Sequence, residues 1–89
     1  MRTVCQIDKD GPHGTSTCEM FAGDDKPGRV YRSLETIIPQ PCGDDDVRHV
    51  GLWFENGVLT DYDGVYQLRR FEIECIRLAE FTVPQEFEP

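Results

Sequence analysis

Two groups of carboxylates are the residues whose types and spacing could support chemistry in this chain. Asp61 and Asp63 flank a tyrosine in the segment VLTDYDGVY, and Asp44, Asp45 and Asp46 form a run after a proline-containing stretch. Carboxylates grouped in this way hold divalent cations, act as nucleophiles or acids, or attract a positively charged partner.

Aromatic residues lie beside the first of these groups. Trp53 and Tyr62 belong to residues 50–66, which contain four of the nine aromatic side chains. Tryptophan and tyrosine flanked by charge are typical of protein interaction surfaces. The alternative is that another β segment or the C-terminal tail covers this aromatic face. The predicted partner-binding residues are Trp53, Tyr62, Asp61, Asp63, Asp44, Asp45 and Asp46.

The segment VLTDYDGVY resembles the first motif of the haloacid dehalogenase phosphatase family, an apolar strand followed by D-x-D-G-T/V. The resemblance covers residues 58–65. It implies that Asp61 takes a phosphoryl group as the nucleophile, that Asp63 is the general acid and that magnesium lies between them. It also implies a parallel α/β sheet. Magnesium-dependent phosphoryl transfer is therefore one alternative function.

Metal binding is a second alternative. The four cysteines are separated by 13, 24 and 33 residues, so the chain contains no C-x-x-C zinc knuckle. The candidate ligands that gather locally are Asp8, Asp10, His13 and Cys18. A small metal-stabilised module would contain a stoichiometric zinc ion.

The cysteines also bear on the compartment. The opening MRTVCQID contains no apolar signal-peptide core, and no run approaches the roughly 20 apolar residues of a membrane span. We therefore expect a cytoplasmic protein with reduced, mostly buried thiols.

The charge favours a basic partner. Seventeen acidic and nine basic residues give a formal net charge of −8. This excess repels nucleic acid phosphates and anionic membranes, so direct binding to either is disfavoured. We expect an interaction protein without catalysis or cofactor. In its extreme form it would be an inhibitor that mimics nucleic-acid charge and blocks a nucleic-acid-binding enzyme, as small acidic proteins of mobile elements do.

A hairpin must position the aromatic and acidic residues. Asn56-Gly57 lies between two β-prone runs and predicts a two-residue turn, because both residues tolerate positive φ. The implied register pairs Phe54 with Leu59 and Trp53 with Thr60. It predicts a core face of Val50, Leu52, Phe54 and Leu59, and a second face containing Trp53, Thr60 and Tyr62.

Further elements follow from periodicity. Residues 2–8, 16–21 and 29–38 are predicted strands, and a helical period begins at residue 68 and ends at residue 79. Its predicted buried face contains Leu68, Phe71, Cys75 and Leu78, with Ile73 exposed. Arg69 and Arg70 oppose the helix dipole at its amino end, which predicts an acidic group nearby. Phe81 or Val83 is expected to dock, and the last residues to fray.

Together these elements predict one domain spanning residues 1–89. Its class is α+β, with an antiparallel sheet of four or five strands and one C-terminal helix packed on it. An exposed edge strand could pair with a second copy, so a homodimer is a further expectation.

Overall fold

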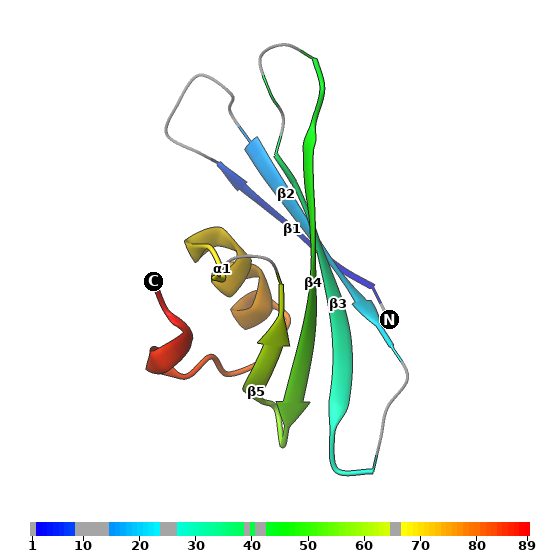
Figure 1. Cartoon of the computed structure of the whole chain (residues 1–89), viewed down its shortest axis with the longest axis vertical. Coiled ribbons are helices and arrows are strands. Elements are labelled where there is room, and N and C mark those ends of the chain that lie inside the picture. The colour runs from blue at the N-terminus through cyan, green and yellow to red at the C-terminus, as the bar shows by residue number, and fades with distance from the viewer. Residues whose placement is uncertain (1, 9–14, 24–26, 39, 41–42, 65–66) are drawn as a thin grey trace.

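The fold is an antiparallel sheet with one helix packed against it (Figure 1). The computed structural model describes residues 2–8, 15–23, 27–38, 40, 43–64 and 67–89. Within them, five strands follow the order β1-β2-β3-β4-β5, so each strand pairs with its neighbour in sequence. The elements are β1 (Arg2–Asp8), β2 (Thr15–Ala22), β3 (Val30–Ile38), β4 (Asp46–Glu55), β5 (Val58–Asp63), α1 (Arg70–Leu78) and the 3-10 helix η1 (Gln85–Phe87). The predicted α+β class is confirmed.

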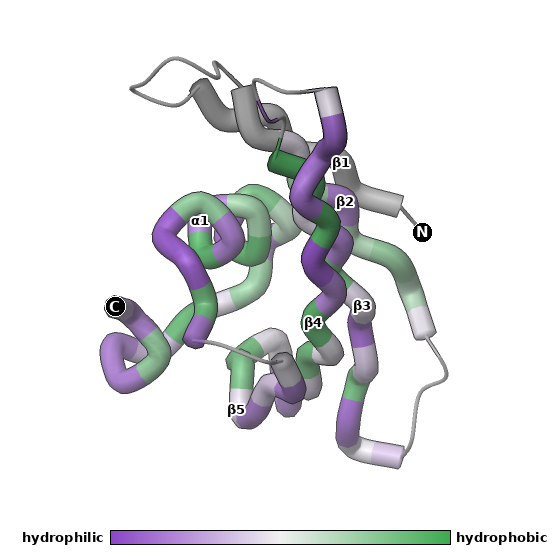
Figure 2. Tube along the Cα trace, turned by 45° about the horizontal axis from the view of Figure 1, so that its top comes forward, coloured by the Kyte–Doolittle hydropathy of each residue, from purple (hydrophilic) through white to green (hydrophobic). Residues whose placement is uncertain are grey.

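The sheet has two unlike faces. In Figure 1, α1, η1 and the C-terminal segment all lie on one side of the sheet, which we call the inner face. No described helix or tail segment lies on the opposite side, the outer face. Hydrophobic and hydrophilic residues alternate along much of β4 (Figure 2), and its burial alternates in the same way from Val50 to Glu55. The buried core on the inner face comprises Cys18, Met20, Leu34, Val50, Leu52, Phe54, Leu59, Leu68, Phe71, Ile73, Cys75, Ile76 and Val83.

The predicted turn between β4 and β5 is present. Asn56 has φ 52° and Gly57 has φ 79°, the positive angles of a type I′ hairpin turn. Phe54 pairs with Leu59, as the sequence predicts. Val50, Leu52, Phe54 and Leu59 are all buried, so the predicted core face is confirmed.

Beyond that pair, the predicted register is wrong by one residue. Trp53 pairs with Asp61 and Leu52 pairs with Tyr62, which leaves Thr60 as the extra residue of a β-bulge. The bulge interrupts the backbone ladder next to Trp53. There the Thr60 hydroxyl donates a hydrogen bond to the Trp53 carbonyl at 3.2 Å. Because of the bulge, Tyr62 lies on the inner face and Asp61 on the outer face.

The buried side of α1 differs partly from its prediction. Leu68, Phe71 and Cys75 are buried as expected. Ile73, however, is only 2% exposed, whereas Leu78 is 65% exposed. Ile73 lines a recess together with Glu88 and Pro89, so the C-terminal tail covers a side of the helix that would otherwise face solvent.

The amino end of α1 has the acidic neighbours that its arginines predict. The backbone N–H of Arg69, the N-cap residue, donates to Glu72 Oε1 at 2.8 Å. Asp46 Oδ2 lies 4.0 Å from Arg69 Nη2. Both carboxylates offset the unfavourable charge at the positive end of the helix dipole.

The C-terminal segment docks on β5 and on the core. Leu59 N–H donates to Thr82 O at 2.9 Å, and Thr82 N–H donates to Gly57 O at 2.8 Å. Phe81 stacks on Phe54 with ring centroids 4.0 Å apart, and Val83 is 7% exposed. Docking is therefore confirmed for both predicted residues. The expected fraying is wrong at residues 85–87, where η1 forms.

Candidate protein-binding face

An aromatic pair stands near the hairpin end of the outer face. Tyr31 of β3 lies directly opposite Trp53 of β4, with ring centroids 5.2 Å apart and planes inclined by 58°. Both side chains are half-buried. The helix and the C-terminal segment lie on the other side of the sheet (Figure 1).

Two glycines fix the position of Tyr31. A Cβ atom at Gly51 would lie 3.2 Å from Tyr31 Cε2, and one at Gly23 would overlap the same ring. The Tyr31 ring therefore lies directly against backbone at both positions, a packing in which an aromatic side chain covers strand glycines. The Tyr31 ring also contacts the Trp53 ring, in addition to the two glycines. Sequence analysis missed Tyr31, because its place opposite Trp53 depends on the pairing of β3 with β4.

Carboxylates lie beside Trp53 on the outer face. Asp61 lies across from Trp53, and Asp63 lies across from Gly51, so both belong to the outer face. Glu55 is also on this face, with its side chain 52% exposed. Trp53, Asp61 and Asp63 are thus brought together as one group.

A second acidic row crosses the same face. Glu19 of β2 lies opposite Glu35 of β3, and Glu35 lies opposite His49 of β4. His49 Nδ1 is 3.7 Å from Glu35 Oε2. Like charges placed opposite each other destabilise a sheet.

Arg29 introduces a cation beside the aromatic pair. Its Cζ lies 5.7 Å from the centroid of the Trp53 ring, within the range of a cation–π interaction. Its Nε lies 3.9 Å from Glu55 Oε1, which is an ion pair but too long for a hydrogen bond. The side chain is 38% exposed.

Tyr62 does not join Trp53, although the two residues are predicted to share a face. Its ring packs edge-on against Phe87 with centroids 5.7 Å apart, and it lies against the hydrophobic core. The cause is the bulge at Thr60, which reverses the alternation of side chains beyond it. Of the two alternatives for the aromatic face, coverage by the C-terminal segment holds for Tyr62, whereas Trp53 belongs to the open outer face.

The Asp44–46 run lies apart from the other predicted site residues. All three aspartates are exposed. Asp46 begins β4, seven residues before Trp53, which corresponds to about 23 Å along a strand. Asp46 also lies near Arg69, on the inner face. The two acidic groups therefore lie toward opposite ends of the sheet (Figure 1).

A buried polar cluster joins the helix to the sheet. Glu72 of α1 is fully buried, and its Oε2 accepts a hydrogen bond from Thr36 Oγ1 at 2.8 Å. Arg48 Nε is 3.2 Å from the same oxygen, and Arg48 Nη2 donates to Gln67 O at 2.9 Å. This cluster could not be predicted from the sequence, since its members come from separate elements. Because Glu72 is fully enclosed, the cluster has a structural role.

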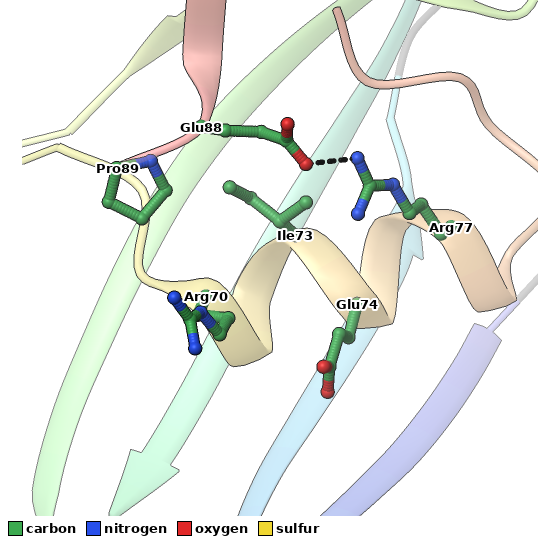
Figure 3. A pocket seen from close by; sticks show the side chains of 6 residues that line it. All are labelled: Arg70, Ile73, Glu74, Arg77, Glu88 and Pro89. Carbon is green, nitrogen blue, oxygen red and sulfur yellow. Dashed lines mark hydrogen bonds and ion pairs between the residues drawn. The ribbon is translucent and has the colours of Figure 1, made fainter. Parts of the chain in front are cut away.

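A shallow pocket of about 260 Å³ lies between α1 and the C-terminal tail (Figure 3). It is lined by Arg70, Ile73, Glu74, Arg77, Glu88 and Pro89. Arg77 and Glu88 face each other as an ion pair, whereas Arg70 and Glu74 point away from that pair. The volume is below that of typical ligand sites, and the lining charges are of both signs, so the pocket selects no ligand class.

The structure bears on both alternative functions, phosphoryl transfer and metal binding. β5, which carries Asp61 and Asp63, is antiparallel to β4, so the parallel α/β sheet implied by the phosphatase resemblance is not present. Among the described residues, no group of three or more His, Cys, Asp or Glu side chains could share a metal ion. The candidate zinc ligands Asp10 and His13, and the side chain of Asp8, lie outside the residues that the structure describes. Cys18 and Cys75 are buried in the core.

The relationships of the chain to known proteins give no further assignment. Comparison with family models, with curated proteins and with solved structures found no match. Within the described part of the chain, no helix has the length and apolar character needed to cross a membrane.

Proposed function

We propose that this protein is an intracellular interaction domain without catalysis, and that its outer face binds a basic surface of another protein. The observation that carries the proposal is the half-buried Tyr31–Trp53 pair, which shares the outer face with the carboxylates of Glu55, Asp61 and Asp63. The side chains of Cys18 and Cys75 are buried in the core, where cysteine packs as a small apolar residue.

The chemistry of the outer face matches such a partner. Large aromatic side chains held in place supply the anchors of protein interfaces, because they bury much area at little cost in conformational entropy. In the described strands β2 to β5, the acidic side chains on this face are Glu19, Glu35, Glu55, Asp61 and Asp63, whereas the basic groups near them are Arg29 and His49. The net negative charge favours basic surfaces and rejects acidic ones.

The Asp44–46 run has a different part in this proposal. These aspartates are exposed and lie far from the aromatic pair, so they attract a basic partner during its approach. Charges at the rim of an interface change the association rate, whereas contacts at its centre change the dissociation rate. The two acidic groups therefore contribute to different rate constants.

Two triple variants with the same change in charge test the assignment. Glu55→Gln, Asp61→Asn and Asp63→Asn neutralise the outer face, and Asp44→Asn, Asp45→Asn and Asp46→Asn neutralise the loop. The probe is a labelled peptide of mixed lysine and arginine, followed by stopped-flow anisotropy. We expect the outer-face variant to dissociate about tenfold faster, from three exposed pairs of about 0.5 kcal/mol each, and the loop variant to associate more slowly.

Salt concentration supplies the control for charge. Affinity for the peptide should fall as the Debye length shrinks from about 10 Å at 0.1 M to about 3 Å at 1 M. Equal effects of the two triple variants on both rate constants would reduce the proposal to non-specific attraction. Absence of salt-dependent binding by the wild type would refute it.

In its strongest form, the proposal makes this protein a mimic of nucleic-acid charge. A carboxylate face that occupies a basic groove excludes the phosphates that bind there. The protein should then displace a labelled DNA duplex from a basic nucleic-acid-binding domain, and the outer-face triple variant should displace it less. A ternary complex of domain, duplex and this protein would show that the groove is not the site of binding.

A further inference from the structure

We propose that the outer face selects arginine rather than lysine side chains of the partner, and that Arg29 occupies the arginine position while the protein is free. This inference rests on the proposed function and names the chemistry of its central contact. It starts from the Arg29 guanidinium, which already lies over Trp53 and beside Glu55.

Trp53 and its neighbours fit a guanidinium. A guanidinium is planar, stacks on an aromatic ring and donates in a fork to a carboxylate, whereas an ammonium is a compact and more strongly hydrated charge. Trp53 supplies the ring, and Glu55 and Asp61 supply carboxylates on the same face of the sheet. The Tyr31 ring packs against the Trp53 ring, so the aromatic surface is in place before a partner arrives.

The contacts that hold Arg29 over Trp53 are weak. Its Nε is shielded from solvent and makes no hydrogen bond within the described structure. The Glu55 Oε1 atom lies 3.9 Å from this nitrogen, beyond hydrogen-bond distance. A partner arginine that reaches Glu55 or Asp61 at hydrogen-bond distance would make better contacts than Arg29 does. Arg29 therefore competes with the partner instead of assisting it.

Trp53 is the only tryptophan of the chain, so its fluorescence reports directly on this position. The probes are two peptides of about twelve residues, in which glycine alternates either with arginine or with lysine. Binding is measured by Trp53 emission and independently by calorimetry. We expect the arginine peptide to bind about two- to fivefold more tightly, the range that a cation–π contact of 0.5 to 1 kcal/mol gives.

Removal of Arg29 tests the internal competition. Arg29→Gln should tighten binding of the arginine peptide relative to Arg70→Gln, which removes the same charge from the exposed face of α1. Circular dichroism and thermal unfolding establish that both variants are folded. The gain should be larger for the arginine peptide than for the lysine peptide, because only the local site distinguishes them.

The outcomes separate this inference from the proposed function. Equal affinity for the two peptides, or equal effects of Arg29→Gln and Arg70→Gln, would overturn the arginine assignment and leave a basic partner in place. Weaker binding by Arg29→Gln would show that Arg29 contributes to the interface and would also overturn the assignment. Binding of neither peptide at low salt would remove both proposals.

Discussion

At the scale of single residues, Tyr31 is the side chain on which the outer face depends most. It contacts Trp53 and lies against the backbone at Gly23 and Gly51. The φ angle of neither glycine lies in the positive range, so space alone requires glycine at these positions. The packing is specific to one ring at one place in the sheet.

Substitution of Gly23 tests this packing. Gly23→Ala places a methyl group where the Tyr31 ring lies, and we expect a loss of about 1 to 3 kcal/mol in the free energy of unfolding, the range for overpacked sites. In a Tyr31→Ala background the same change should be close to neutral. Urea denaturation of the four proteins measures the coupling, and an equal cost in both backgrounds would show that Tyr31 is not the obstacle.

The buried pair of Arg48 and Glu72 is the residue-scale feature with the largest expected effect on stability. Removal of one partner leaves a buried charge without compensation and should cost about 3 to 5 kcal/mol. Arg48→Met and Glu72→Met are therefore each expected to be strongly destabilising.

The double variant is the control for this pair. Replacement of a buried ion pair by apolar residues of similar volume is often neutral, so the combination of Arg48→Met and Glu72→Met should be more stable than either single variant. Thermal unfolding of the set measures this difference. Additive losses would mean that each side chain stabilises the fold independently of the other.

At the scale of elements, the hairpin shows how far sequence reasoning reaches. The turn and the pairs adjacent to it follow from Asn56-Gly57, because positive φ angles are a local property of those residues. The bulge at Thr60 could not be predicted, since it depends on which face the sheet must bury. The same limit explains Ile73, which is covered by a tail ten or more residues further along the chain.

Burial of a charged residue is a second feature that the sequence does not predict. Glu72 lies on a helix next to apolar residues, and periodicity alone assigns a glutamate to solvent. Its burial becomes understandable only when Thr36 and Arg48, from two other strands, are placed beside it. By contrast, the exposed state of Asp61, Asp63 and the Asp44–46 run agrees with their charge.

The turn itself gives a prediction at this scale. Gly57 has φ 79°, a conformation that costs an L-residue about 1 to 2 kcal/mol. Gly57→Ala should lower the free energy of unfolding by about that amount, whereas Asn56→Gly keeps a residue that accepts positive φ and should change it little. Thermal unfolding of both variants provides the comparison. Equal stability of Gly57→Ala and wild type would mean that the turn adopts another form.

The edge formed by β5 bears on self-association. Its first half is paired with Thr82, and its second half carries Asp61 and Asp63 beside a bulge. Short, charged and bulged edges resist pairing with further strands. A homodimer through this edge is therefore disfavoured.

At the scale of the whole molecule, the net charge of −8 opposes the compact state. Screening by salt should reduce this repulsion more than it weakens the few exposed ion pairs. We therefore expect the melting temperature to rise as the concentration of sodium chloride increases from about 0.05 M to about 0.5 M. The triple variant of Asp44, Asp45 and Asp46 carries less charge, so its melting temperature should depend less on salt. A fall in the wild-type melting temperature would show that exposed ion pairs dominate.

The bulge at Thr60 has a consequence for how the length of this chain can vary. Thr60 is the residue of β5 that has no partner across the ladder, while Asp61, Tyr62 and Asp63 lie opposite Trp53, Leu52 and Gly51. Loss of Thr60 would leave those three pairs unchanged, because the strand would then continue without interruption. Loss of a residue from the regular part of β4 would instead turn its buried side chains outward. Thr60 can therefore be deleted without changing which side chains of the hairpin face the core and which face solvent.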